Sequence, residues 1–220
     1  MKFFVLVKNE MRENMIPAML CMAVTLGFGT AITKSGINSK WQWGRLGLDP
    51  EINISALLDD VMGFVFSCAI GFAIFMAIKQ FILPTANRTW SFLLHRSVSK
   101  YQILCSKITA CLLLVMITLG LPWSYLCWLG LSAKLPTTGY TYIHGCCFIG
   151  IAFLLYLAMA IIAVSQARWV GTRLFPIIVL SLVSLLFAGV TTTIVVTSLI
   201  LSTIILVIDL FTQFSFREFK

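Results

Sequence analysis

Long apolar runs separated by short polar segments dominate the pattern along the chain. Candidate membrane-spanning cores lie at residues 16–32, 61–78, 108–131, 143–164, 174–190 and 194–210. Each is close to the ~20 apolar residues that a helix needs to cross a bilayer. The runs are continuous and do not show the short alternating segments of a membrane barrel. The pattern therefore predicts an all-α integral membrane protein with about six transmembrane helices.

The last two cores form one apolar stretch, residues 174–210, which must be interrupted. As a single helix it would be about 55 Å long, well beyond a ~30 Å hydrocarbon core. We expect the break at residues 189–193, where Gly189 and three threonines replace the Leu/Ile/Val pattern. A plain hairpin is the simplest interpretation, and a re-entrant element within this stretch is the alternative.

Composition supports the membrane assignment. Of 220 residues, 60% are hydrophobic and 11% are charged, whereas soluble domains carry roughly 25% charged residues. The net charge of +8 is a weak argument for nucleic-acid binding, so we expect no nucleic-acid partner. Most of the seven cysteines lie inside apolar runs, which disfavours a disulfide framework. The first 13 residues are too charged for a cleavable signal peptide.

The distribution of Lys and Arg predicts an orientation. With six spans, twelve of these residues fall on the side of both termini and four on the other. Because basic residues concentrate on the cytoplasmic side, both termini are predicted to be cytoplasmic.

Two segments outside the predicted spans are not ordinary polar loops. Residues 1–14 place Phe3, Phe4, Val7 and Met11 at helical spacing among charged side chains, which predicts an amphipathic helix in the membrane interface. The connection over residues 84–107 presents apolar side chains beside basic ones, which is typical of a docking surface for a soluble partner or for anionic headgroups. Its candidate contact residues are Arg88, Trp90, Phe92, Leu93, Leu94, His95 and Arg96.

Small residues on the second predicted span indicate close helix packing. Gly63, Ser67 and Gly71 are spaced four apart, as are three alanines of the same span. Such spacing lets two helix backbones approach closely in a membrane. We expect the glycine-containing face to pack against another helix, either within the chain or in a dimer.

Candidate chemistry is sparse. Asp209 is the one acid inside a predicted core, and it lies near the end of that core, so we predict no catalytic residues. His144, Cys146 and Cys147 form a set that could bind a soft metal such as Cu(I). Helix packing by small residues is the favoured interpretation of this segment, and no metal site is predicted.

The layout resembles the permeases of type-2 ABC exporters, which have an elbow helix, six spans and a cytoplasmic helix between spans two and three. The segment Trp90-Ser-Phe-Leu-Leu-His-Arg-Ser-Val-Ser-Lys100 is similar to a leucine-rich segment ending in Arg-Pro-Val-Ser-Arg that these permeases carry before span three. Phe214-Ser-Phe-Arg-Glu-Phe219 also resembles their basic–acidic C-terminal end.

The resemblance implies a permease subunit in a bacterial cytoplasmic membrane. A separate cytoplasmic ATPase would bind ATP and Mg²⁺ and dock on the loop residues named above, so this chain would hold no cofactor. A second copy or a homologous permease would complete a homodimer or heterodimer. The sequence contains no phosphate-binding G-x-x-x-x-G-K-[ST] loop, so we expect this chain not to be an enzyme. The alternative is a non-transporting membrane anchor or assembly scaffold that recruits a partner through the same loop.

Overall fold

Apolar sequence and intrahelical hydrogen bonding produce a bundle of long helices in the computed structural model. It describes residues 2–45, 51–87, 99–132, 139–165, 170–186 and 191–216. The helices before the central connection are α1 (Lys2–Glu13), α2 (Met15–Arg45), α3 (Glu51–Ala77), the π-helical turn η1 (Ile78–Ile82) and α4 (Leu83–Ala86). Those after it are α6 (Lys100–Val115), the π-helical turn η2 (Met116–Gly120), α7 (Leu121–Ser132), α8 (Gly139–Val164), α9 (Val170–Leu186) and α10 (Thr192–Phe216).

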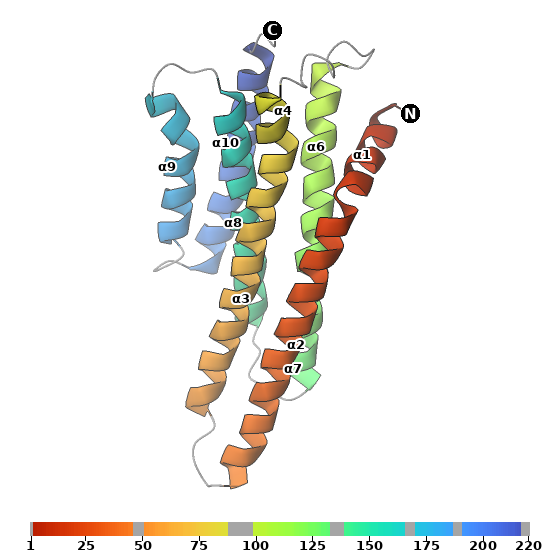
Figure 1. Cartoon of the computed structure of the whole chain (residues 1–220). Coiled ribbons are helices and arrows are strands. Elements are labelled where there is room, and N and C mark those ends of the chain that lie inside the picture. The colour runs from red at the N-terminus through yellow and green to blue at the C-terminus, as the bar shows by residue number, and fades with distance from the viewer. Residues whose placement is uncertain are drawn as a thin grey trace.

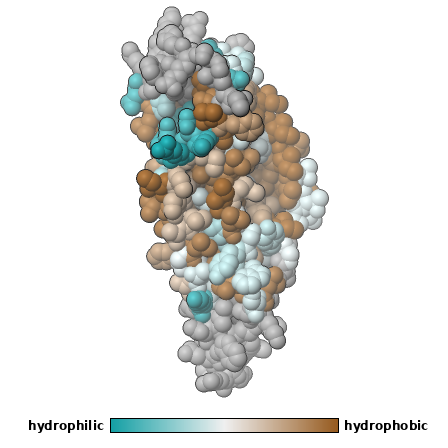
Figure 2. All heavy atoms as spheres, turned by 90° about the vertical axis from the view of Figure 1, so that its right-hand side faces the viewer, coloured by the Kyte–Doolittle hydropathy of each residue, from teal (hydrophilic) through white to brown (hydrophobic). Residues whose placement is uncertain are grey.

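The helices run side by side, and both ends of the chain lie at the same end of the bundle (Figure 1). Helix α8 packs against α3, α9 and α10 and is the most buried of the apolar helices. Tyr156, Leu157 and Ile161 of α8 are fully buried. In Figure 2, hydrophobic side chains cover much of the middle of the surface, and hydrophilic ones gather towards the end that holds the termini. This distribution is what a bilayer-embedded bundle requires.

Five helical segments in the described part of the chain are long and apolar enough to cross a membrane. They are Met15–Lys34, Val61–Ala86, Lys100–Ser132, Thr141–Val164 and Thr192–Ser215. The fold is therefore all-helical and multi-pass in character. Helix α9 is shorter, and its apolar part covers Phe175–Ser184. Its 17 residues correspond to about 26 Å at 1.5 Å per residue. Six membrane crossings thus remain a proposal that depends on α9.

The apolar stretch at residues 174–210 contains two helices rather than one. Helix α9 ends at Leu186, before the predicted break at residues 189–193, and α10 begins at Thr192, within it. Thr191 starts α10 by accepting backbone hydrogen bonds from Ile194 and Val195 through its carbonyl oxygen.

The connection between the second and third apolar segments is shorter than the sequence pattern indicated. Helical structure continues from α3 through η1 and α4 to Ala86, and α6 already begins at Lys100 instead of at residue 108. Ser99 caps α6, because its side chain accepts a hydrogen bond from the Gln102 amide. Residues 79–86 and 100–107 therefore belong to the helical bundle, and this correction moves Lys107 from a loop into a helix.

Two prolines explain the two π-helical turns. Pro84 and Pro122 each lie two residues after the end of such a turn. A proline donates no hydrogen bond to the carbonyl four residues earlier, and its ring would clash with that carbonyl in a regular α-helix. A wider turn relieves the clash. Accordingly, the Leu83 amide donates to the Ile78 carbonyl, and the Leu121 amide donates to the Met116 carbonyl, each five residues back.

Helix α1 precedes α2 and packs beside α6 (Figure 1). One side of α1 packs on the bundle and the other is exposed. Val7 is buried, whereas Phe4, Val5, Lys8 and Arg12 are exposed. The helix is present where the sequence predicted one. Its position in the membrane interface remains a prediction.

Candidate functional site

The loop residues predicted to dock a partner lie outside the described residues. They fall in residues 88–98, between Asn87 and Ser99. The prediction for Arg88, Trp90, Phe92, Leu93, Leu94, His95 and Arg96 therefore stays a prediction. Both flanking segments, α4 and the start of α6, lie at the end of the bundle that holds the two termini (Figure 1).

The two rows of small residues on α3 have different environments. The alanine row is fully buried: Ala69, Ala73 and Ala77 lie in the core. Gly63, Ser67 and Gly71 are exposed, and a Cβ added at either glycine would meet no atom within 4 Å. The alanine row thus makes the contacts within the chain. Packing of the glycine row against a second copy remains a prediction.

The segment with His144, Cys146 and Cys147 does not form a metal centre among the described residues, which contain no group of three or more metal-ligating His, Cys, Asp or Glu side chains. Cys146 is exposed and Cys147 is buried. The His144 ring lies edge-on to Phe148, with ring centroids 6.5 Å apart. Nearby Gly145 lies directly against the Trp123 ring of α7. Gly145 therefore lies in the contact between α7 and α8.

A buried ion pair is the most distinctive polar feature of the described bundle. The Lys107 ammonium of α6 lies 2.6 Å from the Glu10 carboxylate of α1. The two side chains are 7% and 18% exposed. Removing two charges from water is costly, so a buried pair is retained only with close geometry and further hydrogen bonds. Here the pair joins residues that are 97 positions apart in the sequence.

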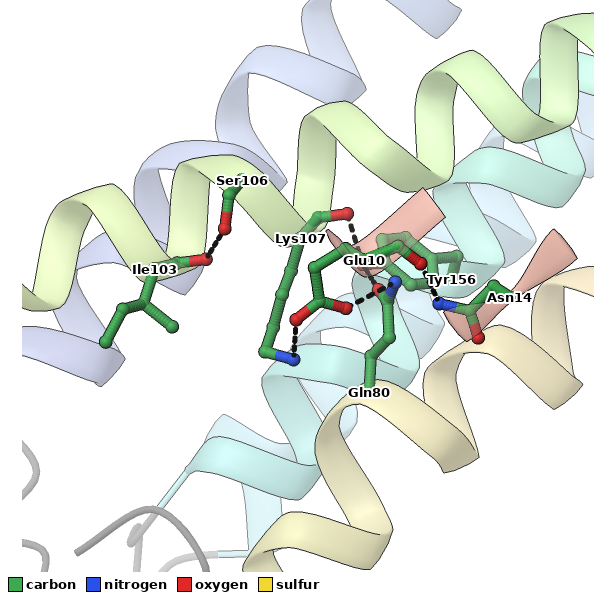
Figure 3. Close-up of polar contacts among 7 residues, drawn as sticks. All are labelled: Glu10, Asn14, Gln80, Ile103, Ser106, Lys107 and Tyr156. Atoms are coloured by element: carbon green, nitrogen blue, oxygen red, sulfur yellow. Dashed lines mark hydrogen bonds and ion pairs between the residues drawn. The ribbon is translucent and has the colours of Figure 1, made fainter. Parts of the chain in front are cut away.

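Gln80 and Tyr156 extend this ion pair into the core (Figure 3). The Gln80 amide of η1 donates to the second Glu10 carboxylate oxygen at 3.5 Å. The Tyr156 hydroxyl of α8 donates to the Gln80 side-chain oxygen at 2.5 Å and lies 3.4 Å from the Lys107 backbone carbonyl. Tyr156 is fully buried and Gln80 is 2% exposed. Four elements, α1, η1, α6 and α8, therefore meet in one hydrogen-bonded group.

The bend between α1 and α2 is held by a third contact, and Pro17 explains why. Pro17 has no amide hydrogen for the Glu13 carbonyl four residues earlier. The Lys79 ammonium of η1 donates to that carbonyl instead, at 2.6 Å. At the bend, the Asn14 side chain also donates to the Glu10 carbonyl at 2.7 Å.

We call this group the polar junction; it comprises Glu10, Asn14, Lys79, Gln80, Lys107 and Tyr156. It contains two lysines and one carboxylate. Its donors come from η1, α6, α8 and the bend, and α1 supplies most of the acceptors. It holds no nucleophile–base pair and no metal-ligand set. What it can do is fasten α1 to three other elements, so that a movement of one is passed to the others. Ionisable residues buried inside the helices of a membrane protein are commonly paired and functional.

Sequence reasoning missed the polar junction because the boundaries of the predicted spans were set by hydropathy. The predicted third core began at residue 108, one position after Lys107, so Lys107 was counted as a loop cation. Gln80 follows the end of the second predicted core at residue 78, and nothing local to Glu10 indicates a partner so distant in sequence. A usable signal did exist: Pro84 and Pro122 mark irregular turns in apolar helices, where polar side chains tend to be functional.

Comparisons with known proteins do not identify the chain. No family model, curated protein or solved structure matches it.

Proposed function

We propose that this chain is the membrane-spanning permease subunit of an ATP-driven ABC exporter, which docks a separate cytoplasmic ATPase through residues 88–98. The basis is the sequence resemblance described above. A multi-pass helical bundle in which the N- and C-terminal ends of the chain lie at the same end also supports it. The chain would be a multi-pass protein of a bacterial cytoplasmic membrane, with six crossings and both termini in the cytoplasm.

The polar junction is the observation that supports the proposal best. It lies at the end of the bundle from which the docking segment departs, because α4 follows η1 directly and α6 carries Lys107. Force applied to residues 88–98 would reach η1 through α4, a distance of only a few residues. From η1, Lys79 and Gln80 contact the α1–α2 bend and Glu10, and Gln80 contacts Tyr156. A docked ATPase could thus move α1, the second span and the fourth span together.

Co-purification tests the proposal. The tagged chain is extracted from its native membrane in mild detergent, and its partners are identified by mass spectrometry. The wild type is expected to bring down a protein with an ATP-binding phosphate loop in near-stoichiometric amount. With the double variant Trp90→Ala/Leu94→Ala, the amount of ATPase recovered is expected to fall by a factor of about ten or more, because hot-spot aromatic residues dominate such interfaces.

A matched control comes from the other end of the molecule. Trp128 and Leu131 on α7 are 61% and 59% exposed. The double variant Trp128→Ala/Leu131→Ala removes the same side-chain types and should retain the ATPase. If no ATPase accompanies the wild-type chain, the permease proposal is wrong. A different stoichiometric partner that depends on Trp90 and Leu94 would favour the membrane-anchor alternative.

The composition of the assembly can be read from the same material. Two copies of the chain with different tags are expressed together, and one tag is used for purification. Recovery of the second tag indicates a homodimer, whereas a homologous permease at equal amount indicates a heterodimer. Either result is compatible with an exporter. A strictly single copy with an ATPase would contradict it.

A further inference from the structure

Two buried amide side chains in the polar junction have incomplete hydrogen bonding. Asn14 is 1% exposed, and its amide nitrogen donates to the Glu10 carbonyl. Its side-chain oxygen, Oδ1, accepts no hydrogen bond from the described part of the chain. A buried acceptor without a donor is destabilising, so each example in a native structure calls for an explanation.

In Gln80, the donor and not the acceptor is weakly hydrogen-bonded. Its side-chain oxygen accepts a short hydrogen bond from Tyr156, at 2.5 Å. Its amide nitrogen reaches the Glu10 carboxylate only at 3.5 Å, the long limit for a hydrogen bond. Glu10 does not need that contact to be neutralised, because Lys107 lies 2.6 Å away. Gln80 thus has a weakly used donor, and Asn14 has an unused acceptor.

Both amides contact the same residue, Glu10, from η1 on one side and from the α1–α2 bend on the other (Figure 3). The backbone of each is irregular. Gln80 lies in the π-helical turn before Pro84, and Asn14 lies between two helices at the position where Pro17 interrupts the hydrogen-bond pattern.

We propose that the polar junction has two settings that differ in the partner of the Gln80 amide. In the first setting, which the structure shows, Gln80 Nε2 faces the Glu10 carboxylate. In the second setting, Gln80 Nε2 donates to Asn14 Oδ1 while Glu10 remains paired with Lys107. The exchange gives up one long hydrogen bond and satisfies the buried acceptor of Asn14. This exchange of hydrogen bonds takes place within the chain and does not depend on the proposed export function.

Fluorine NMR of Tyr156 can detect the two settings. The chain has five tyrosines, so labelling with 3-fluorotyrosine gives a simple spectrum, and Tyr156→Phe assigns the Tyr156 signal. The purified chain in lipid nanodiscs, without any partner, is expected to give two Tyr156 signals or one broadened by exchange, because Tyr156 donates to Gln80 in the observed setting. A single sharp signal without relaxation dispersion would overturn the proposal, and ordered water would then be the better explanation of Asn14.

A variant identifies the acceptor. Asn14→Leu removes Oδ1 at similar size and should abolish the second signal or the exchange broadening of Tyr156. Asn9→Leu is the control, because Asn9 is exposed on α1, the helix that ends just before Asn14; it should leave the Tyr156 signals unchanged. Exchange that persists in Asn14→Leu would show that Asn14 is not the alternative acceptor. The Tyr125 signal, from exposed α7, reports whether the variant is folded, and if it is not, the wild-type spectrum alone decides.

Discussion

The two π-helical turns have the same local cause and different surroundings. Each precedes a proline by two residues, and each is closed by a hydrogen bond five residues back. At η1, Gln80 contacts α1 and α8 through side-chain hydrogen bonds. At η2, the buried Thr118 donates only to the Leu114 carbonyl of its own helix.

The neighbourhood of η2 is held mainly by apolar packing, with a hydrogen bond from the Trp123 indole of α7 to the Tyr142 carbonyl of α8 at 3.1 Å. Trp123, at the start of α7, lies against Gly145, and Leu126 lies against Gly29 of α2. Beside this region, α2 and α7 line an open apolar cavity of about 480 Å³. The comparison shows that a proline determines the backbone geometry of the turn, whereas the residues packed around the turn determine whether it links helices by charge or by shape.

The largest effect is expected from the ion pair beside η1. Lys107→Met should reduce the free energy of unfolding by about 3–5 kcal/mol, because it leaves the Glu10 carboxylate buried without a counter-charge. Thermal unfolding in nanodiscs measures the change. Lys8→Met is the control, since Lys8 is exposed on the same helix as Glu10. Equal stability of the two variants would show that the ion pair does not fasten α1.

Near η2, the largest effect is expected at Gly145. A Cβ there would lie 2.1 Å from the Trp123 ring, and the rigid ring must then move. Gly145→Ala should cost about 1–3 kcal/mol of stability. Gly27→Ala is the matched control, because a Cβ at Gly27 meets nothing within 4 Å. It should be neutral or stabilising by up to about 1 kcal/mol. The same loss in both variants would rule out the contact with Trp123 as the cause.

Replacing the two prolines should give effects of opposite sign. Pro84→Ala permits regular α-helical pairing and turns Gln80 away from Tyr156, so a net loss of about 1 kcal/mol is expected. Pro122→Ala restores a backbone hydrogen bond at a turn whose own polar side chain, Thr118, bonds only within its helix, so it should be neutral or stabilising as long as the Trp123–Tyr142 hydrogen bond is kept. Hydrogen exchange of the α1 amides should increase in Pro84→Ala alone. An increase in both variants would remove the distinction between the turns.

The smallest effect is expected at Thr118. Its hydroxyl bonds to the Leu114 carbonyl within the same helix, at 2.7 Å. Thr118→Val therefore removes a local hydrogen bond and keeps the side-chain shape, and the loss should stay below about 1 kcal/mol. Gln80→Leu is the counterpart at η1 and should be worse, because the buried Tyr156 hydroxyl then loses its short acceptor. A Thr118→Val variant as unstable as Gln80→Leu would contradict this difference.

Much of the bundle could be predicted from hydropathy, because a long apolar run can satisfy its backbone in a bilayer only as a helix. Helices α2, α8 and α10 contain the predicted cores 16–32, 143–164 and 194–210 and extend beyond them, α2 as far as Arg45. The division of residues 174–210 follows from the limited thickness of a bilayer. The ends of the helices next to the docking segment were wrong. Polar residues such as Lys79, Gln80 and Lys107 lower the local hydropathy, yet they are helical because their charges and amides are satisfied by other helices.

The polar junction itself could not be predicted, because it depends on which helices are neighbours. Glu10 and Lys107 are complementary only once α1 lies along α6, and no local pattern encodes that contact. The role of Lys79 is partly encoded, since Pro17 leaves the Glu13 carbonyl in need of a donor. The donor, however, comes from a residue 66 positions away.

A double-mutant cycle tests most directly whether the Glu10–Lys107 pair fastens α1 to the bundle. The free energies of unfolding are measured for the wild type, Glu10→Gln, Lys107→Met and the double variant under identical nanodisc conditions. Each single variant is expected to lose several kcal/mol, and the double variant should lose at least about 2 kcal/mol less than the sum, because it contains no unpaired buried charge. Losses that add to within about 0.5 kcal/mol would mean that the two charges act independently and that α1 is held by other contacts.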